Sequence, residues 1–145
     1  AKEIERFGIT PKAALLSASD FGSRPMPTSK IMREAAEILF DTDPDLEVDG
    51  EMHSDTALDE TIREKVYPLS KLKGRANLLV FPNLDAANIT MNAVKATSNG
   101  LHVGPIILGT NRPAHILAPA VTSRGVLNMT ALAAVQAIQH DENSG

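Results

Sequence analysis

Apolar and polar positions follow two different periods along the first part of the chain. The run Lys12–Ala18 is predominantly apolar, which is typical of a buried strand. A loop rich in Gly, Pro and Ser follows over Ser19–Pro27. Apolar residues then recur at helical spacing from Ser29 to Phe40, and we predict a helix with Ser29 as its N-cap. The pattern predicts one strand–loop–helix unit.

The same alternation of strand and helix patterns occurs twice more. Apolar residues alternate over Leu46–Met52, which predicts a strand, and a helix is expected over Asp55–Val66. A continuous apolar run, Asn77–Phe81, predicts a third strand, followed by a helix over Asp85–Thr97. These two units extend the order to βαβαβα.

The last third of the chain is expected to add two short strands, Val103–Leu108 and Ala114–Leu117, and a long Ala- and Leu-rich C-terminal helix over 122–140. Alternating strands and helices predict an α/β fold, a mostly parallel twisted sheet flanked by helices on both faces. We predict that residues 1–145 form one partial domain of this kind.

Ligands of such sheets bind at the carboxyl ends of the strands. The loop after the first strand carries hydroxyls, a glycine and a cation, which is the inventory of a phosphate or pyrophosphate cradle. Ordinary turn chemistry explains the same residues. The candidate binding residues of this loop are Ser17, Ser19, Gly22, Ser23 and Arg24.

Two further candidates stand at the start of the third helix, Asp85 and Asn88, where the helix dipole and free N–H groups favour anions. N-capping by Asp85 explains that residue without a ligand. Gly104 and Pro105 are placed on the same rim of the sheet by the expected topology.

Glu51, His53 and Asp55 alternate in the sequence and would share one face of an extended segment, which is one possible arrangement for a divalent metal site. A strand end that leads into an Asp-capped helix is the favoured interpretation, and no metal site is predicted. His102 and His115 lie beside apolar runs, where buried structural roles are expected.

Composition narrows the classes of function. The 145 residues carry a net charge of −4 and, with four Phe, one Tyr and no Trp, offer no stacking platform for nucleic acid. The chain has no Cys and no apolar run near the roughly 20 residues of a membrane span, so we expect a cytoplasmic protein without membrane contact. It also lacks dinucleotide and Walker fingerprints. Because no Met precedes Ala1, we expect a fragment of a longer polypeptide.

Several ordered runs resemble the phosphate acetyl/butyryltransferase family. The longest are Gly74–Ile89, Gly104–Gly109 and Arg112–Pro119, and shorter matches are Ala14–Ser17, Asp49–Glu51 and Ala131–Ala137. The resemblance implies the later part of a fold of two α/β domains with a cleft between them. It also implies pairing of subunits through this part, hence a homodimer or a higher homo-oligomer.

Within that family the chain is most similar to the domain appended to NADP-dependent hybrid malic enzymes, on Asp49–His53, Pro82–Asn88 and Val126–Leu132. The resemblance implies that NADP and a divalent metal, Mg or Mn, belong to the missing malic-enzyme part, and that no cofactor belongs to this chain. It implies acetyl-CoA or a related acyl-CoA as an effector that the candidate binding residues would contact.

The family motif of Leu-Ser-Arg-Gly with a later Asp is altered here. A gapless match places Ala118, Pro119 and Ala120 at Ser-Arg-Gly and Gly125 at the Asp. We therefore predict no catalytic residue in the chain, and a regulatory and oligomerising role. The alternatives are an active phosphate acetyltransferase that uses Ser123 and Arg124 from a shifted loop, and a purely structural dimerisation module.

Overall fold

The computed structural model describes residues 1–119 and 121–142. The chain divides into two compact units, Ala1–Ala93 and Val94–Gly145, each of which is described by itself. Ala120, one of the positions that the family motif singles out, lies outside the described residues.

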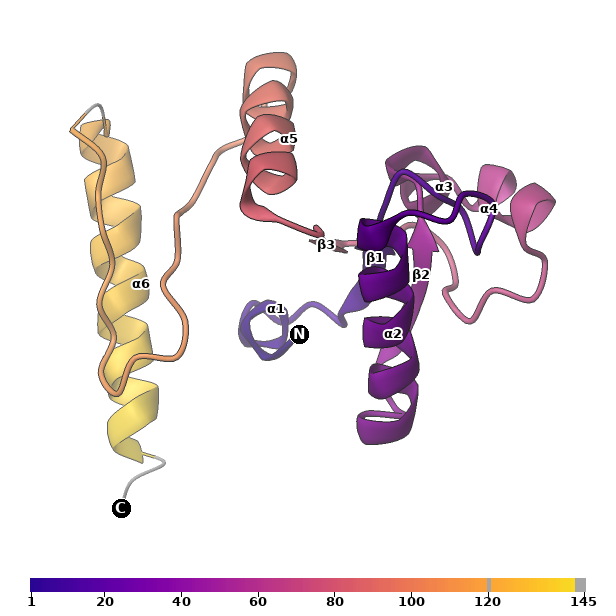
Figure 1. Cartoon of the computed structure of the whole chain (residues 1–145). Helices are drawn as coiled ribbons and strands as arrows, with labels where there is room; N and C mark the ends of the chain where they lie inside the picture. The colour runs from indigo at the N-terminus through magenta and orange to yellow at the C-terminus, as the bar shows by residue number, and fades with distance from the viewer. Residues whose placement is uncertain (120, 143–145) are drawn as a thin grey trace. The chain divides into compact units, whose positions relative to one another are not determined.

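The first unit contains a three-stranded parallel sheet in the order β2-β1-β3 (Figure 1). This confirms the predicted α/β class and its parallel strands. The helix α5 runs across the boundary between the two units. The elements in chain order are α1 (Lys2–Arg6), β1 (Lys12–Leu16), α2 (Pro27–Thr42), β2 (Glu47–Met52), α3 (Ser54–Leu58), α4 (Glu60–Val66), β3 (Leu78–Val80) and α5 (Leu84–Thr97).

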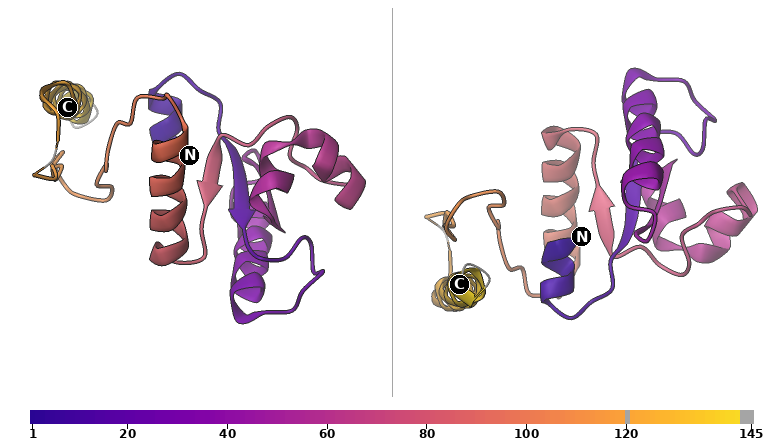
Figure 2. Two further views of the ribbon diagram at one scale, coloured as in Figure 1. Left: turned by 90° about the horizontal axis from the view of Figure 1, so that it is seen from above. Right: turned by 90° about the horizontal axis from the view of Figure 1, so that it is seen from below.

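Strand β1 is buried on both faces, as its continuous apolar run predicts. Ala13 and Leu15 face one core cluster, which α2 completes with Met32 and Ala36. The alternate residues Ala14 and Leu16 face a second cluster, which contains Met52 of β2, Ala57 of α3 and the loop residues Leu72 and Ala76. Helices therefore cover both faces of this sheet, and the views of Figure 2 show α2 and the α3–α4 pair beside it.

The predicted start of α2 was wrong by three residues. The helix begins at Pro27, which suits the first helical position because no N–H is needed there, and Met26 is the N-cap. Ser29 is buried at the third position of the helix, within its first turn. Its hydroxyl oxygen lies 2.9 Å from the carbonyl oxygens of Arg24 and Met26, which share its single hydrogen as acceptors, and it accepts from the Met26 N–H at 2.9 Å. Ser29 therefore fixes the end of the preceding loop.

The helix predicted over Asp55–Val66 is in fact two helices, because Asp59 interrupts it. Asp59 adopts an extended backbone, and its carboxylate caps α4 by accepting from the N–H groups of Thr61 at 2.8 Å and Ile62 at 3.3 Å. A side chain that competes for backbone donors in this way ends one helix and begins another.

Gly50 allows β1 and β2 to approach closely. Its φ is +142°, and a Cβ added there would lie 2.6 Å from the Leu15 carbonyl oxygen and 2.9 Å from the Leu15 Cβ. We expect Gly50→Ala to destabilise the first unit by about 1–3 kcal/mol, measured by thermal unfolding. Gly8→Ala is the control, because Gly8 also has a positive φ, +72°, but nothing lies within 4 Å of its added Cβ. Equal losses in the two variants would contradict the steric explanation.

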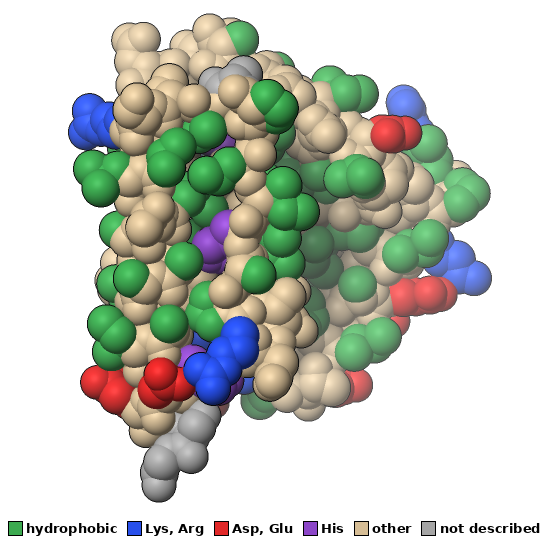
Figure 3. All heavy atoms as spheres, turned by 90° about the vertical axis from the view of Figure 1, so that its left-hand side faces the viewer, with side chains coloured by type: hydrophobic (Ala, Val, Ile, Leu, Met, Phe, Trp, Pro, Cys, Tyr) green, Lys and Arg blue, Asp and Glu red, His purple; other side chains and the backbone are tan. Residues whose placement is uncertain are grey.

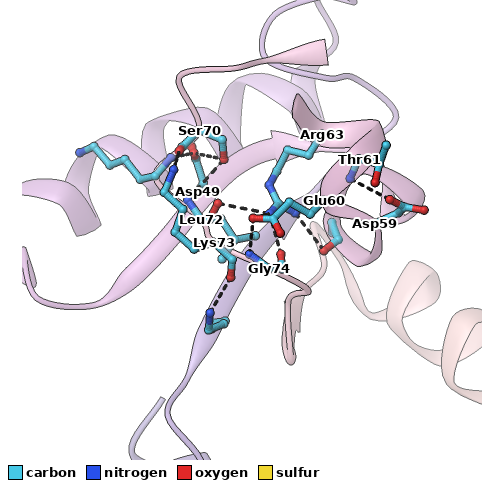
Figure 4. A network of polar contacts seen from close by, with 12 residues as sticks. Asp49, Asp59, Glu60, Thr61, Arg63, Ser70, Leu72, Lys73 and Gly74 are labelled. Atoms are coloured by element: carbon cyan, nitrogen blue, oxygen red, sulfur yellow. Dashed lines mark hydrogen bonds and ion pairs between the residues drawn. The ribbon is translucent and has the colours of Figure 1, made fainter. Parts of the chain in front are cut away.

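The irregular segment that connects α4 to β3 is held by a polar network (Figure 4). Asp49, buried in β2, accepts from the Ser70 hydroxyl at 2.7 Å and from the Lys71 N–H at 2.6 Å. Glu47 accepts from the Lys73 N–H at 2.5 Å, and Glu60 accepts from the Gly74 N–H at 2.6 Å. Carboxylates thus replace the strand partners that this backbone lacks.

Arg63 lies at the centre of the same network, with 1% of its surface exposed. Its guanidinium donates to the carbonyl oxygens of Thr56 at 3.2 Å, Ala57 at 3.4 Å, Leu72 at 3.2 Å and Gly74 at 2.6 Å. Glu60 is its nearest carboxylate, at 3.8 Å. One arginine therefore joins α3, α4 and the segment before β3.

The second unit contains the end of α5, an irregular segment and α6 (Ser123–Glu142). The strands predicted at Val103–Leu108 and Ala114–Leu117 are absent, since neither segment pairs with another strand in the described part of the chain. Pro105 and Pro113 lack a backbone donor, and the φ of Gly104 is +139°, outside the range of a strand.

Side-chain contacts of His115 hold this segment in place of strand pairing. His115 accepts from the Ile107 N–H at 3.3 Å and bonds to Gln136 of α6 at 2.8 Å. His115 is half-buried, and its two hydrogen bonds fit the predicted structural role, whereas His102 is exposed and the burial predicted for it was wrong.

Helix α6 leaves much apolar surface uncovered. It buries Met129 and Gln136, whereas Leu127, Val135 and Ile138 are 68%, 51% and 59% exposed. Figure 3 shows apolar side chains along this side of the molecule. No helix among the residues that the structure describes is long and apolar enough to span a membrane.

Candidate functional site

The loop after β1, residues 17–24, lies at the carboxyl end of the sheet and is tied to β2. The Ser17 N–H donates to the Met52 carbonyl oxygen at 2.9 Å, and the Phe21 N–H donates to that of Glu51 at 2.7 Å. Phe21 and Gly22 have φ values of +44° and +89°. The chain therefore turns sharply here and brings its backbone over the end of β2.

The buried carboxylate of Glu51 organises this loop. Its Oε1 accepts from the Ser19 hydroxyl at 2.8 Å and from the Gly22 N–H at 2.9 Å. Arg33 of α2 donates from Nε to Oε2 at 2.9 Å and from Nη2 to Oε1 at 3.0 Å. Glu51 is fully buried, so this two-point ion pair replaces the water that the charge has lost.

The same contacts determine the protonation of Glu51. Burial acts to raise the pKa of its carboxyl group, but the hydrogen bonds from Arg33, Gly22 and Ser19 outweigh burial and lower that pKa below its ordinary value of 4.5. Glu51 is therefore a charged, fixed acceptor under the loop. Its position within a buried strand is the sequence signal for such a role, because a buried carboxylate needs partners.

A second carboxylate of the loop, Asp20, holds the residue that follows β2. Its Oδ1 accepts from the His53 N–H at 2.7 Å, and its Oδ2 lies 2.8 Å from His53 Nδ1. The His53 side chain is 44% exposed. Glu51 and His53 thus have different partners, and the residues of the described ranges contain no group of three His, Asp or Glu placed to hold a metal ion.

Most of the residues predicted to form the phosphate cradle lie close together, but the hydroxyls of Ser19 and Ser23 bond to groups of the protein. Ser19 is buried, and its oxygen also accepts from the Arg24 N–H at 3.0 Å. Ser23 accepts from the Asp20 N–H at 3.0 Å. The Ser17 hydroxyl is buried without a partner among the described residues, and the Arg24 side chain is exposed. Ligand binding by these residues stays a prediction.

The two candidates on α5 have local partners. Asn83 caps the helix by accepting from the Ala86 N–H at 2.9 Å, so the interpretation of Asp85 as the cap was wrong. Asp85 is exposed in the first turn, and the Asn88 side chain accepts from Asn92 at 2.8 Å. The amide of Asn83 reaches the helix donors first because it precedes the helix.

Gly104 and Pro105 belong to the second unit, in an irregular segment instead of the predicted strand, and residues 17–24 belong to the first unit. Gly104 lines a recess of about 280 Å³ within that unit, together with Thr122 and Gly125. Gly125 is the residue that the gapless match sets against the Asp of the motif, whereas Pro105 is exposed outside the lining. The recess brings two of the positions matched to the family together.

Arg33 is the functional candidate that the sequence reasoning missed. It lies on an amphipathic helix beside the core-facing residues, 18 residues from Glu51 in the chain, and nothing in that spacing links the two. An exposed helix arginine has no distinctive pattern. Only the crossing of α2 over β2 shows the pair.

Comparison with known sequences places the chain among acyltransferases and malic enzymes. It is 61% identical over 136 residues to an NAD-dependent malic enzyme of Rhizobium meliloti, and 48% identical over 138 residues to an NADP-dependent malic enzyme of Escherichia coli. It is 41% identical to a phosphate acetyltransferase of Paracoccus denitrificans. The chain spans 18% of each malic enzyme and 40% of that acetyltransferase. The expected NADP thus matches the name of one relative, while another is named for NAD.

Solved structures agree with the sequence comparison. A phosphotransacetylase from Streptococcus pyogenes superposes with a TM-score of 0.86 at 34% identity, over 98% of this chain and 42% of that one. The EutD phosphotransacetylase from Staphylococcus aureus gives a TM-score of 0.82 at 31% identity, over 96% and 42%. The family model described as phosphate acetyl/butaryl transferase matches residues 1–134. The chain therefore belongs to the phosphate acetyl/butaryl transferase family.

Proposed function

We propose that this chain is a regulatory and oligomerising domain of a malic enzyme, which binds acetyl-CoA or a related acyl-CoA without transferring the acyl group. The observation that carries the proposal is a family scaffold whose reacting side chains are replaced. In the family motif the Ser and Asp would orient or activate the CoA thiol, and the Arg would clamp charge. Ala118, Pro119 and Gly125 stand at those positions and cannot donate a side-chain hydrogen bond.

The size of this loss supports binding without turnover. Removing one donor that acts on the transition state costs about 3 kcal/mol of barrier. Three such losses would bring transfer below detection, whereas contacts to the body of CoA contribute to affinity independently. A site that binds a ligand and does not consume it is suited to an effector.

The relatives support the malic-enzyme context. The malic enzymes named above share 61% and 48% identity with the chain, against 41% for the acetyltransferase of Paracoccus denitrificans. Malate oxidation, its nicotinamide cofactor and its metal would belong to the rest of the polypeptide. The exposed apolar residues of α6, Leu127, Val135 and Ile138, support an interface in a homodimer or larger homo-oligomer.

The test is titration of the complete polypeptide with acetyl-CoA by calorimetry, with malate kinetics measured in parallel. We expect saturable binding and a change in malate kinetics of roughly 5- to 150-fold, the usual range of coupling between sites. Binding should also raise the thermal unfolding temperature. Absence of both binding and a kinetic effect would contradict the effector role. Dimers in sedimentation without any CoA effect would favour a structural dimerisation module.

A working acetyltransferase is the second candidate, favoured by the triplet Ser123–Arg124–Gly125. Ser123 and Arg124 are exposed in the first turn of α6. The complete polypeptide would be assayed for acetyl-CoA formation from acetyl phosphate and CoA, beside a Ser123→Ala, Arg124→Ala double variant. We expect no turnover in either protein. Turnover that the double variant loses would replace our proposal with this one.

A further inference from the structure

The Glu51 carboxylate holds the Arg33 guanidinium in one orientation and bonds to only some of its N–H groups. Glu51 accepts from Nε at 2.9 Å and from Nη2 at 3.0 Å, which occupies the side edge of the guanidinium. The Arg33 side chain is 44% exposed, whereas the Glu51 side chain is fully buried. The buried carboxylate therefore fixes the plane of a cation that still reaches solvent.

Arg33 has N–H donors that its bonds to Glu51 leave unused. A guanidinium has five N–H groups, of which Glu51 takes one on Nε and one on Nη2. The other hydrogen of Nη2 and one hydrogen of Nη1 lie along the end edge, and neither has an acceptor among the described residues. Such an edge carries parallel N–H groups whose spacing matches two oxygens of a phosphate.

The loop 17–24 leaves room for this guanidinium. A Cβ added at Gly22 would lie 3.5 Å from Nη2, 3.7 Å from Cζ and 3.8 Å from Nη1, so Gly22 lies over the face of the group. Arg24 follows two residues later in the loop with an exposed side chain. The loop that carries Arg24 thus covers the face of the Arg33 guanidinium at Gly22.

The charged groups near Arg33 are the carboxylates of Glu51 and Glu37 and, in the neighbouring loop, Asp20 and Arg24. Glu51 compensates Arg33, and the Asp20 carboxylate is occupied by His53. The hydrogen bond and the charge of Glu51, with a smaller contribution from the Glu37 charge, raise the pKa of Arg33 above its ordinary value, so the guanidinium stays protonated. No carboxylate is paired with Arg24 in the described residues, which leaves its charge available for an anion.

We propose that the end edge of Arg33 binds a phosphate group of the acyl-CoA ligand, beside Gly22 and Arg24. The identity of the ligand rests on the proposed function. The paired N–H groups of the end edge, called the fork below, can bind any phosphate group. The phosphate could come from the pyrophosphate or the 3′-phosphate of CoA, or from free inorganic phosphate. The experiment separates these sources.

The test compares three variants of the complete polypeptide. Arg33→Gln removes the fork, Arg33→Lys keeps a cation for Glu51 without the fork, and Lys30→Gln is a control on the same helix with an exposed side chain. The probes are acetyl-CoA, acetyl-dephospho-CoA and inorganic phosphate, each titrated calorimetrically. Thermal unfolding of every variant shows whether the fold is kept.

We expect Arg33→Gln to weaken acetyl-CoA binding roughly 10- to 100-fold, the usual effect of hydrogen bonds to a charged group. Arg33→Lys should also weaken it, although less, and Lys30→Gln should match the wild type. An equal loss with acetyl-dephospho-CoA assigns the fork to the pyrophosphate, and a loss confined to acetyl-CoA assigns it to the 3′-phosphate.

The two proposals can fail separately. A folded Arg33→Lys variant that binds acetyl-CoA as tightly as the wild type overturns the fork and leaves the effector role standing. A wild type that binds inorganic phosphate through Arg33 but ignores acetyl-CoA supports the fork and overturns the effector role. A wild type that binds none of the three probes overturns both.

Discussion

Replacing Arg63 with Ala is expected to destabilise the α3–α4 region by about 3–5 kcal/mol. The substitution leaves the carbonyl oxygens of Thr56, Ala57, Leu72 and Gly74 without their donor, and it opens a cavity where a large side chain was 1% exposed. Unsatisfied buried acceptors cost about 1–3 kcal/mol each, and local relaxation that admits water reduces the sum. Hydrogen exchange on the complete polypeptide measures the effect, in peptides that cover α3, α4 and residues 67–76.

Arg75→Ala is the matched control for this substitution. Arg75 lies next to Gly74 in the sequence, but its side chain is exposed. Its loss should change the exchange of the same peptides by no more than about 0.5 kcal/mol. If Arg63→Ala leaves exchange in α3 and α4 unchanged, then the four carbonyl contacts contribute no net stability and the interpretation fails.

Replacing Glu51 with Gln is expected to cost about 3 kcal/mol at pH 7, the low end for a broken buried ion pair, because Arg33 remains half exposed. A Gln side chain has one acceptor oxygen, and its NH₂ group would face a donor of Arg33 or of the loop. Thermal unfolding at pH 7 gives the size of the loss. Glu64→Gln, at an exposed position of α4, is the control and should be nearly neutral.

The same substitution should change how stability depends on pH. The folded pKa of Glu51 is lower than the ordinary 4.5, so the native state favours the charged form. Its contribution is complete above pH 4.5 and is lost as the pH falls below that value, through the folded pKa. The difference between the wild type and Glu51→Gln should therefore shrink between pH 4.5 and pH 3. A difference that stays constant over this range would show that the Glu51 charge does not stabilise the fold.

Much of the first unit could be predicted from the sequence because local patterns determine it. The continuous apolar run of β1 and the helical stripe of α2 each specify their element without reference to distant residues. Helix boundaries were less well predicted. Ser29 and Asp59 are both good capping residues, but Ser29 sits inside a helix that Pro27 begins, and Asp59 divides what looks like one helix.

The strands predicted in the second unit failed for a different reason. Apolar runs such as Val103–Leu108 become strands only where a neighbouring strand supplies hydrogen bonds, and here Val103 and Leu108 are 39% and 61% exposed. His115 and Gln136 provide a side-chain link instead. Their contact joins residues 21 positions apart, which no local pattern can reveal.

The candidate site was predictable only as far as one loop. The hydroxyls, the glycine and the cation of residues 17–24 are visible in the sequence, but the groups that organise the loop come from α2 and β2. Arg33 and Glu51 look like one exposed cation and one strand carboxylate until the fold pairs them. The sequence therefore identifies the loop but does not reveal the Arg33–Glu51 pair that holds it.

The polar network around residues 70–74 limits where residues can be inserted into the chain or deleted from it. Connecting segments usually accept insertions, since few contacts depend on their spacing. Here Asp49, Glu47 and Glu60 each bond to a particular backbone N–H between Lys71 and Gly74. One additional residue between Lys71 and Gly74 would move at least one of those donors out of register with its carboxylate. Relatives should therefore vary in length at the turn around residues 43–46 and keep the spacing between Ser70 and Gly74.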